Sequence, residues 1–287
     1  IFGMYLYRLI FPVRLLYDYS YNQIPEAGWI NPVVLISLVI LIALAYLALK
    51  NLKRQNVLSF AIIYFGITIS VGLAFVLLRG GIMAERFLYA PVLGFSIAVN
   101  YYLFKLLPRE RKTKRIIYDF KPGASKLFLG ILTVMLVLYS VRTVARNPVW
   151  KDNFTLFSTD IRYGGNSALL RKHYGSELIN QAVVTEDKAL SDSLMQRGIA
   201  EVQKSLEINP RFSEAYFKLG YAYYQLRDFE RAIEYYKHAN QNNSMTVSNM
   251  ALAYYMTGEY GEALRMLKRA LQLDPENATA RKNLPLV

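Results

Sequence analysis

One short stretch of the sequence places an acid, a guanidinium and a phenol between two long apolar runs. Glu85 and Arg86 are neighbours, and Tyr89 follows three residues later. An arginine can make two parallel hydrogen bonds to a phosphate, and ionisable side chains at membrane depth are costly enough to indicate function. These residues therefore predict a site for the phosphate of a lipid-linked substrate. The alternative is an ion pair between Glu85 and Arg86 that anchors a helix end at the membrane interface.

Residues that break helices surround the same stretch. Gly80 and Gly81 precede it, and Pro91 and Gly94 follow it. The glycine pair favours a re-entrant turn after the preceding apolar run, whereas Pro91 and Gly94 are expected to loosen the start of the next one. Non-helical backbone at membrane depth has to be surrounded by protein or by a water-filled cavity.

Four apolar runs are long enough to cross a bilayer, for which about 20 residues are needed. The predicted spans cover residues 32–49, 57–78, 87–107 and 127–145. Arg142 lies near the end of the fourth run, where its side chain can snorkel to the interface. Residues 1–21 are apolar but interrupted by arginine and proline. They are expected to lie in the interface or to end a preceding span, rather than to form a fifth span.

The charge distribution predicts the orientation of these spans. Of the net charge of +13, residues 1–150 contribute +12, from 17 Lys and Arg against 5 Asp and Glu. The excess lies in short segments between apolar runs, chiefly residues 50–56 and 108–126, which the positive-inside rule places in the cytoplasm. Residues after Arg146 then lie outside the cytoplasm. Because topology accounts for the basic residues, we do not expect the chain to bind nucleic acid.

Composition disfavours two further classes of site. The chain has no Cys and two His, so disulfides and thiolate metal sites are excluded and a histidine-built metal site is not expected. A transporter would place ionisable residues in the middle of its spans, where the sequence offers Asn100 instead. An amide at that depth more often joins two helices by a hydrogen bond.

The polar C-terminal half contains a repeat. Within residues 213–244, small residues such as Gly220 and Ala232 recur at the positions where the tetratricopeptide repeat (TPR) has them, so this stretch resembles that repeat. The pattern returns 31 residues later. A degenerate unit lies upstream and contains an insertion at residues 180–196. Small residues are needed where two helices of a unit touch, and large ones fill the groove between units.

Three tyrosines of the repeats fall off the consensus positions and are predicted to line the concave, partner-binding face. They are Tyr221, Tyr224 and Tyr255. Asn147 or Asp152 is expected to cap a helix that precedes the repeats, and residues 276–287 are expected to form a terminal capping helix. The repeats therefore predict a short solenoid with one surface for a protein.

The order of these features resembles one known family. The motif "AERFLYAPVLGF" is followed by a span, by "RNPVWKDNFTLF" and by TPR units, as in the transmembrane and tetratricopeptide-repeat O-mannosyltransferases, which are C-type polytopic glycosyltransferases. The matching positions of the motif are Ala84, Glu85, Arg86, Leu88, Tyr89, Pro91, Gly94 and Phe95. "DYSYNQIP" resembles an outward loop of that family, so Asp18 and Tyr19 are further candidates for the site.

Pattern and resemblance together imply an all-α protein. A polytopic transmembrane domain is expected at residues 1–146, and a short extracytoplasmic TPR α-solenoid at residues 147–287. The resemblance implies transfer of a sugar from a polyprenyl-phosphate donor, bound by Arg86, Glu85 and Tyr89, to a protein acceptor held by the TPR units. Membrane lipid is the other expected partner. The composition favours a bacterial inner membrane, with the C-terminal domain in the periplasm.

The catalytic acid of that family has no matching acidic pair in residues 1–287, so the sequence leaves open whether this chain is itself an enzyme. The alternative is a non-catalytic, membrane-anchored TPR scaffold within a larger membrane complex. An outward loop with paired carboxylates upstream of Ile1 would favour the enzyme. A stoichiometric partner that co-purifies in detergent would favour the scaffold.

Overall fold

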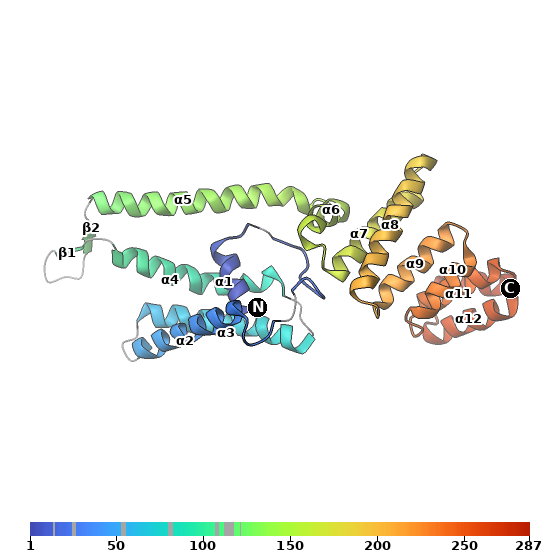
Figure 1. Cartoon of the computed structure of the whole chain (residues 1–287), viewed down its shortest axis with the longest axis horizontal. Coiled ribbons are helices and arrows are strands. Elements are labelled where there is room, and N and C mark those ends of the chain that lie inside the picture. Colours follow the sequence, from blue (N-terminus) through green and yellow to red (C-terminus); the bar gives the residue numbers. More distant parts are fainter. Residues whose placement is uncertain are drawn as a thin grey trace. The chain divides into compact units, whose positions relative to one another are not determined.

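A computed structural model describes residues 1–13, 15–24, 27–52, 56–79, 83–106, 109–111, 118–120 and 122–287. The described chain is predominantly helical and divides into two compact units, whose elements Figure 1 colours from blue to red along the sequence. The first unit contains residues 1–16 and 25–151, and the second contains residues 17–24 and 152–287. The second unit thus includes a segment that the sequence predicted to belong with the membrane domain.

The first unit consists of apolar helices, of which α3 packs against both α2 and α4, and α1 packs against α2. Its elements are α1 (Phe2–Ile10), α2 (Pro32–Leu52), α3 (Val57–Arg79), the 3₁₀ turn η1 (Glu85–Leu88), α4 (Pro91–Leu106), β1 (Arg109–Arg111), β2 (Tyr118–Phe120), α5 (Pro122–Arg146) and the 3₁₀ turn η2 (Asn147–Trp150). Apolar residues at nearly every position of α2 and α3 leave these helices without a polar face, which is typical of helices surrounded by lipid or by protein.

Within the described residues, two helices rather than the predicted four are long and apolar enough to cross a membrane. They are Pro32–Lys50 and Phe128–Trp150. Only 6% and 0% of their most apolar windows are buried, so neither helix forms the core of this unit. The predicted second and third spans lie in α3 and α4, whose shorter apolar stretches are Val57–Leu73 and Pro91–Phe104.

The predicted third span is shortened because its first residues do not join the helix. They form η1, and α4 starts at Pro91, whose fixed φ suits a first helical position. The 16 residues of α4 rise about 24 Å, less than the roughly 30 Å of a hydrocarbon core. Gly94 does not loosen the helix as predicted. A Cβ there would lie 2.7 Å from the carbonyl oxygen of Ala61, so the missing side chain lets α3 and α4 approach closely.

A short antiparallel ladder lies between α4 and α5 in the sequence. β1 pairs with β2, and Glu110 stands opposite Asp119. This ladder and residues 122–126 at the start of α5 are the described parts of the basic segment predicted at residues 108–126. The other predicted basic segment, residues 50–56, is described only in part, because residues 53–55 lie outside the described residues. The glycine pair at residues 80–81 lies outside them too.

The second unit is a series of helix pairs, seen from yellow-green to red in Figure 1. Its elements are α6 (Asn153–Gly164), α7 (Ala168–Val184), α8 (Lys188–Ile208), α9 (Ser213–Gln225), α10 (Phe229–His238), α11 (Ser244–Met256), α12 (Tyr260–Leu273), α13 (Ala278–Asn283) and the 3₁₀ turn η3 (Leu284–Leu286). α7 packs with α8, α9 with α10, and α11 with α12. One hydrophobic core runs through these three pairs and reaches the capping helix α13.

The two predicted TPR units are α9–α10 and α11–α12. After the first helix of each unit the chain takes a left-handed conformation, at Arg227 (φ 61°) and at Gly258 (φ 83°). Each of these residues is the seventh after the small residue of its unit, Gly220 or Ala251. The same turn therefore recurs at the same place in the repeat.

The degenerate upstream unit is α7–α8, and the predicted insertion lengthens both helices. α7 has 17 residues and α8 has 21, whereas α9 and α10 have 13 and 10. Of the two caps predicted for the preceding helix, Asp152 is the one that forms. Its side chain accepts a hydrogen bond from the Thr155 N–H at 2.7 Å, which satisfies a free amide in the first turn of α6.

Gly175 marks a close approach of α7 and α8. A Cβ on this residue would lie 2.7 Å from the Gly198 carbonyl oxygen and 2.7 Å from a methyl group of Val202. We predict that Gly175→Ala destabilises the second unit by about 1–3 kcal/mol, because the α8 backbone has to move. Thermal unfolding followed by circular dichroism measures the loss. Gly261→Ala is the control, since its Cβ would meet nothing within 4 Å, and an equal loss there would contradict the prediction.

Candidate functional site

The predicted donor-site residues lie on the turn that precedes α4. Met83 and Ala84, just before η1, are buried. The side chain of Tyr5 of α1, which is completely buried, contacts Ala84. The Tyr5 hydroxyl donates to the Ala84 carbonyl and accepts from the Ala84 N–H, both at 3.4 Å. Gly72 of α3 lies against the turn, because a Cβ there would be 2.8 Å from the Phe87 Cβ. α1 and α3 therefore fix the position of η1.

Glu85 and Arg86 have different partners. A carboxylate oxygen of the half-buried Glu85 accepts a hydrogen bond from the Leu16 N–H at 3.1 Å. The exposed Arg86 extends its guanidinium over the Phe87 ring, 5.6 Å from the ring centroid. Among the described contacts, Glu85 accepts from a backbone amide and Arg86 lies over an aromatic ring, and the two side chains do not contact each other. The ion pair that the sequence offered as an alternative is not formed between these two residues.

Tyr89 directly follows η1 and is 88% exposed. Residues three apart in a 3₁₀ turn lie nearly above one another, so Arg86 and Tyr89 present a guanidinium and a phenol on one surface. The guanidinium can bind a phosphate through its paired N–H groups, and the hydroxyl can donate to or accept from a second oxygen.

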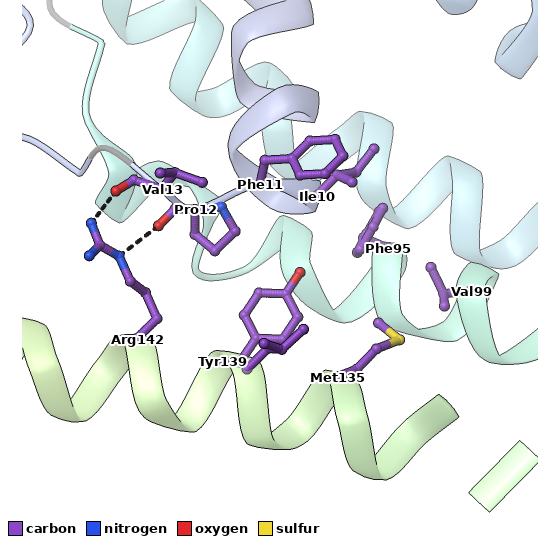
Figure 2. A pocket seen from close by; sticks show the side chains of 10 residues that line it. Ile10, Phe11, Pro12, Val13, Phe95, Val99, Met135, Tyr139 and Arg142 are labelled. Carbon is purple, nitrogen blue, oxygen red and sulfur yellow. Dashed lines mark hydrogen bonds between the residues drawn. The ribbon is translucent and has the colours of Figure 1, made fainter. Parts of the chain in front are cut away.

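An apolar cavity of about 700 Å³ lies between the segment after α1, α4 and α5. Figure 2 shows Phe95 and Val99 of α4 across from Met135 and Tyr139 of α5. Nearly all of its lining side chains are apolar, with Arg142 and Tyr139 as the polar exceptions. Such a lining fits a hydrocarbon better than a sugar.

Arg142 bonds to the backbone of residues 1–21, the stretch that the sequence predicted to lie in the interface or to end a preceding span. Its Nε donates to the Pro12 carbonyl at 3.0 Å and its Nη2 donates to the Val13 carbonyl, as the dashed lines in Figure 2 show. The Tyr139 hydroxyl donates to the Leu9 carbonyl at 2.8 Å. These bonds satisfy carbonyls at and beyond the end of α1, where intrahelical partners are missing. Arg142 therefore ties α5 to the segment that follows α1.

Asp18 and Tyr19 belong to the second unit, within residues Tyr17–Ile24, which we call the strap. Both side chains are buried, with exposed fractions of 5% and 2%. One Asp18 carboxylate oxygen accepts from the Ser167 hydroxyl at 2.5 Å and from the hydroxyl and N–H of Ser20 at 2.5 and 3.0 Å. Ser167 in turn caps α7 by accepting from the Leu170 N–H at 3.0 Å. The carboxylate of Asp18 thus ties the strap to the start of α7.

The backbone of the strap is also paired with the helices. The Tyr17 N–H donates to a carboxylate oxygen of Asp160 at 2.6 Å, and the Ala168 N–H donates to the Tyr21 carbonyl at 2.8 Å. Asp160 is only 1% exposed. The strap is therefore bonded to both α6 and α7 in the second unit. No local sequence pattern predicted this role.

Two neighbouring ionisable residues of α7 that the sequence did not single out are at least partly buried. The His173 ring stacks on Phe157 at 5.0 Å and meets the Tyr17 ring edge-on at 6.0 Å. Burial, and after it the charge of Lys172, lowers the pKa of His173 to about 4. Lys172 is 8% exposed, and its ammonium donates to Glu214 at 2.7 Å. A lone histidine or lysine in a mixed helix gives no signal of such burial.

The tyrosines predicted for the partner-binding face are partly accessible. Tyr221 is half-buried, and the ammonium of Lys218 lies over its ring, 4.6 Å from the centroid. Tyr224 packs edge-on against Phe229 at 5.5 Å, and Tyr255 is 37% exposed. The Lys218 ammonium also donates to Asn180 Oδ1 at 2.7 Å. Burial is the main reason why the pKa of Lys218 is lowered to about 8.

The structure therefore groups the predicted site residues in three places. Glu85, Arg86 and Tyr89 come together on η1 in the first unit. Asp18 and Tyr19 lie inside the second unit, and the three tyrosines lie on its repeats. Among the described residues, no group of three or more His, Asp and Glu side chains is arranged to hold a metal ion.

Two segments of the chain match known sequence families. Residues 202–234 and residues 248–277 each match a family described as tetratricopeptide repeat. These segments contain residues of α8–α10 and of α11–α12. The TPR repeats predicted from the spacing of small and large residues are confirmed.

Three characterised proteins show the wider similarity. The chain is 26% identical to the protein O-mannosyl-transferase TMTC1 of Homo sapiens, over 75% of this chain and 23% of that protein. It is 25% identical to the protein O-mannosyl-transferase Tmtc2 of Drosophila melanogaster, over 62% of this chain and 15% of that protein. The photosystem I assembly protein Ycf3 of Prochlorococcus marinus (strain NATL1A) is 32% identical over 35% of this chain and 60% of its own length.

The predicted resemblance to the transmembrane and TPR-containing O-mannosyl-transferases is confirmed by these similarities. The chain spans less than a quarter of the length of the two transferases that it matches.

Proposed function

We propose that this chain, a TPR protein similar to the O-mannosyl-transferases of the TMTC type, is the C-terminal part of a membrane glycosyltransferase. It moves a sugar from a polyprenyl-phosphate donor to a hydroxyl of a protein acceptor. The observation that carries the proposal is the similarity to TMTC1 over three quarters of the chain, which is too long to come from the repeats alone.

Residues 1–146 form the membrane domain in this proposal, with four spans, and residues 147–287 lie on the extracytoplasmic side, in the periplasm of a bacterium. The exposed apolar side chains of α2 and α5 support it, because such a surface is stable only when it is covered by lipid or by protein. The basic segments at residues 50–56 and 108–126 support the orientation.

Arg86 binds the donor phosphate, Tyr89 lines the same site, and Glu85 positions the turn that carries them. The contacts of η1 support these roles, because Glu85 is bonded to the Leu16 N–H while Arg86 and Tyr89 are exposed. A group that is rigidly held but accessible loses little conformational freedom on binding. Asp18 and Tyr19 contribute indirectly, because both side chains are buried within the second unit.

The TPR units bind the protein acceptor or a partner through the face that carries Tyr221, Tyr224 and Tyr255. Stacked helix pairs build extended concave surfaces, and tyrosine supplies contact area at a small entropic cost. The second candidate function is a membrane-anchored scaffold without catalysis. The similarity to a photosystem assembly protein favours it, together with the absence of a matching acidic pair in residues 1–287.

The substitution Arg86→Ala tests the donor site in the full-length protein. At a polyprenyl-phosphate sugar concentration far below KM, we expect transfer to fall about 20-fold, because a charge-assisted hydrogen bond to phosphate is lost. Most of the rate should return at saturating donor. Arg86→Lys should retain an intermediate rate, since an ammonium keeps the charge and loses the fork. Arg211→Ala, at an exposed arginine before α9, is the matched control.

Radiolabel transfer to acceptor protein measures these rates. Equal activity of Arg86→Ala and wild type at limiting donor would remove the phosphate role from Arg86. A wild-type protein that is inert toward every polyprenyl-linked sugar, and that co-purifies with one stoichiometric partner, would replace the enzyme by the scaffold.

A further inference from the structure

Helix α9 carries a lysine with unusual surroundings. Lys218 is half-buried, yet its ammonium donates a hydrogen bond to a neutral group, the Asn180 amide oxygen, at 2.7 Å. The ring of Tyr221 lies below it. Among the described residues, no carboxylate forms an ion pair with Lys218. A partly desolvated ammonium has three donors to satisfy, so this one has unused capacity for an anion.

The neighbouring charges keep the ammonium available. Lys172 on α7 repels it, Glu177 on α7 attracts it from beyond ion-pair distance, and burial is the strongest influence on its pKa. Lys172 itself is bonded to Glu214, whose side chain is 68% exposed. Glu214 and Lys218 are four residues apart and therefore lie on one face of α9. Glu214 on this face is therefore already paired with Lys172 of α7, whereas Lys218 forms no ion pair among the described residues.

A pocket of about 290 Å³ begins at Glu214, one helical turn before Lys218 on α9. Glu214 and Phe217 line it from α9, and Met245 lines it from α11. Its remaining lining consists of polar groups at the helix starts and in the link between the two repeats: Ser213, Asn240, Asn243 and Thr246. Phe217 and Met245 offer an apolar contact, and the amide side chains offer donors and acceptors that suit a peptide backbone.

We propose that this face is a subsite for an acidic residue in an extended segment of the acceptor or partner protein. The carboxylate binds the ammonium of Lys218, and an apolar side chain nearby in the segment enters the pocket between Phe217 and Met245. This inference rests on the protein-binding half of the proposed function and specifies the class of sequence that is bound. A peptide suits this subsite better than a free anion does. The pocket that begins one turn before Lys218 offers apolar and amide contacts, which a free anion would not use.

Binding of two labelled peptides to the detergent-solubilised full chain tests the proposal. One peptide carries a single glutamate between apolar residues, and the other carries glutamine at that place. By fluorescence anisotropy we expect the glutamate peptide to bind about tenfold more tightly. Lys218→Met should abolish the difference, whereas Lys218→Arg should keep it. Lys268→Met, at an exposed lysine of α12, is the control and should also keep it.

The pH dependence gives a second readout. The pKa of Lys218 in the free protein is about 8, so the preference for glutamate should fall about fivefold between pH 7 and pH 9. Lys218→Arg should hold its preference over the same range, because a guanidinium stays charged. The other charged or titratable groups facing this lysine are Lys172 and Glu177 on α7 and Glu214 and Tyr221 on α9, and all four are unchanged in both variants.

Three results would overturn the proposal: equal affinity of the wild type for both peptides, a preference that survives Lys218→Met, or competition by inorganic phosphate as strong as that by the glutamate peptide. Circular dichroism confirms that each variant is folded. Because the assay measures binding without sugar transfer, a protein that binds the glutamate peptide but transfers no sugar would refute the enzyme and leave this subsite standing. A protein that transfers sugar but binds both peptides equally would refute this subsite and leave the enzyme standing.

Discussion

Replacing Asp18 by alanine is expected to lower the free energy of unfolding of the second unit by about 3 kcal/mol. The carboxylate is buried and accepts three hydrogen bonds, from the Ser167 hydroxyl and from the hydroxyl and N–H of Ser20. Hydrogen bonds to a charged group each contribute roughly 1.5–3 kcal/mol, and the substitution leaves buried donors without a partner. Ser167 also caps α7, so the loss reaches the first turn of that helix.

Native-state hydrogen exchange of the α7 amides in the solubilised chain measures this effect region by region. Asp187→Ala is the control, because Asp187 is an exposed aspartate that caps α8 by accepting from the N–H groups of Ala189 and Leu190. Loss of such a cap costs about 1 kcal/mol. If Asp18→Ala and Asp187→Ala reduced protection equally, the strap would not be an integral part of the second unit.

The strap also shows what sequence reasoning could not supply. The TPR units were predictable because small and large residues recur at fixed short intervals, and helices respond to such local periodicity. Asp18 and Ser167 are 149 positions apart, and each is an ordinary residue for a loop or a helix start. Resemblance placed Asp18 in an outward loop and at the donor site. Its burial against α7 depends on a long-range contact that leaves no local pattern.

The donor-site turn shows a second limit. The sequence pointed to Glu85 and Arg86 because charge is rare between apolar runs, and both residues do lie on one turn held by α1 and α3. Adjacent residues in a helical turn do not face each other, so Glu85 bonds to a backbone amide and Arg86 lies over a ring. The length of the apolar run also overestimated the length of the third span. The run starts at residue 87, whereas the helix begins at Pro91, and composition alone does not show where a helix begins.

The second large effect is a loss of stability in acid. We expect the free energy of unfolding of the second unit to fall by about 2.5 kcal/mol between pH 7 and pH 4.5 through His173 alone. The folded-state pKa of His173 is lowered to about 4, first by burial and then by Lys172, whereas an unfolded histidine titrates near 6.5. The unfolded chain therefore takes up the proton first. The stabilising contribution is complete above about pH 6.5 and is lost as the pH falls toward 4.

The variant His173→Phe isolates this contribution, because a phenyl ring can keep the stack on Phe157 but cannot take up a proton. Urea unfolding of wild type and variant at both pH values gives the difference, in which contributions common to the two proteins cancel. His238→Phe is the control, since His238 is exposed and its removal should leave the full acid loss. An acid loss in His173→Phe as large as in the wild type would show that His173 accepts its proton without disturbing the packing between α6, α7 and the strap.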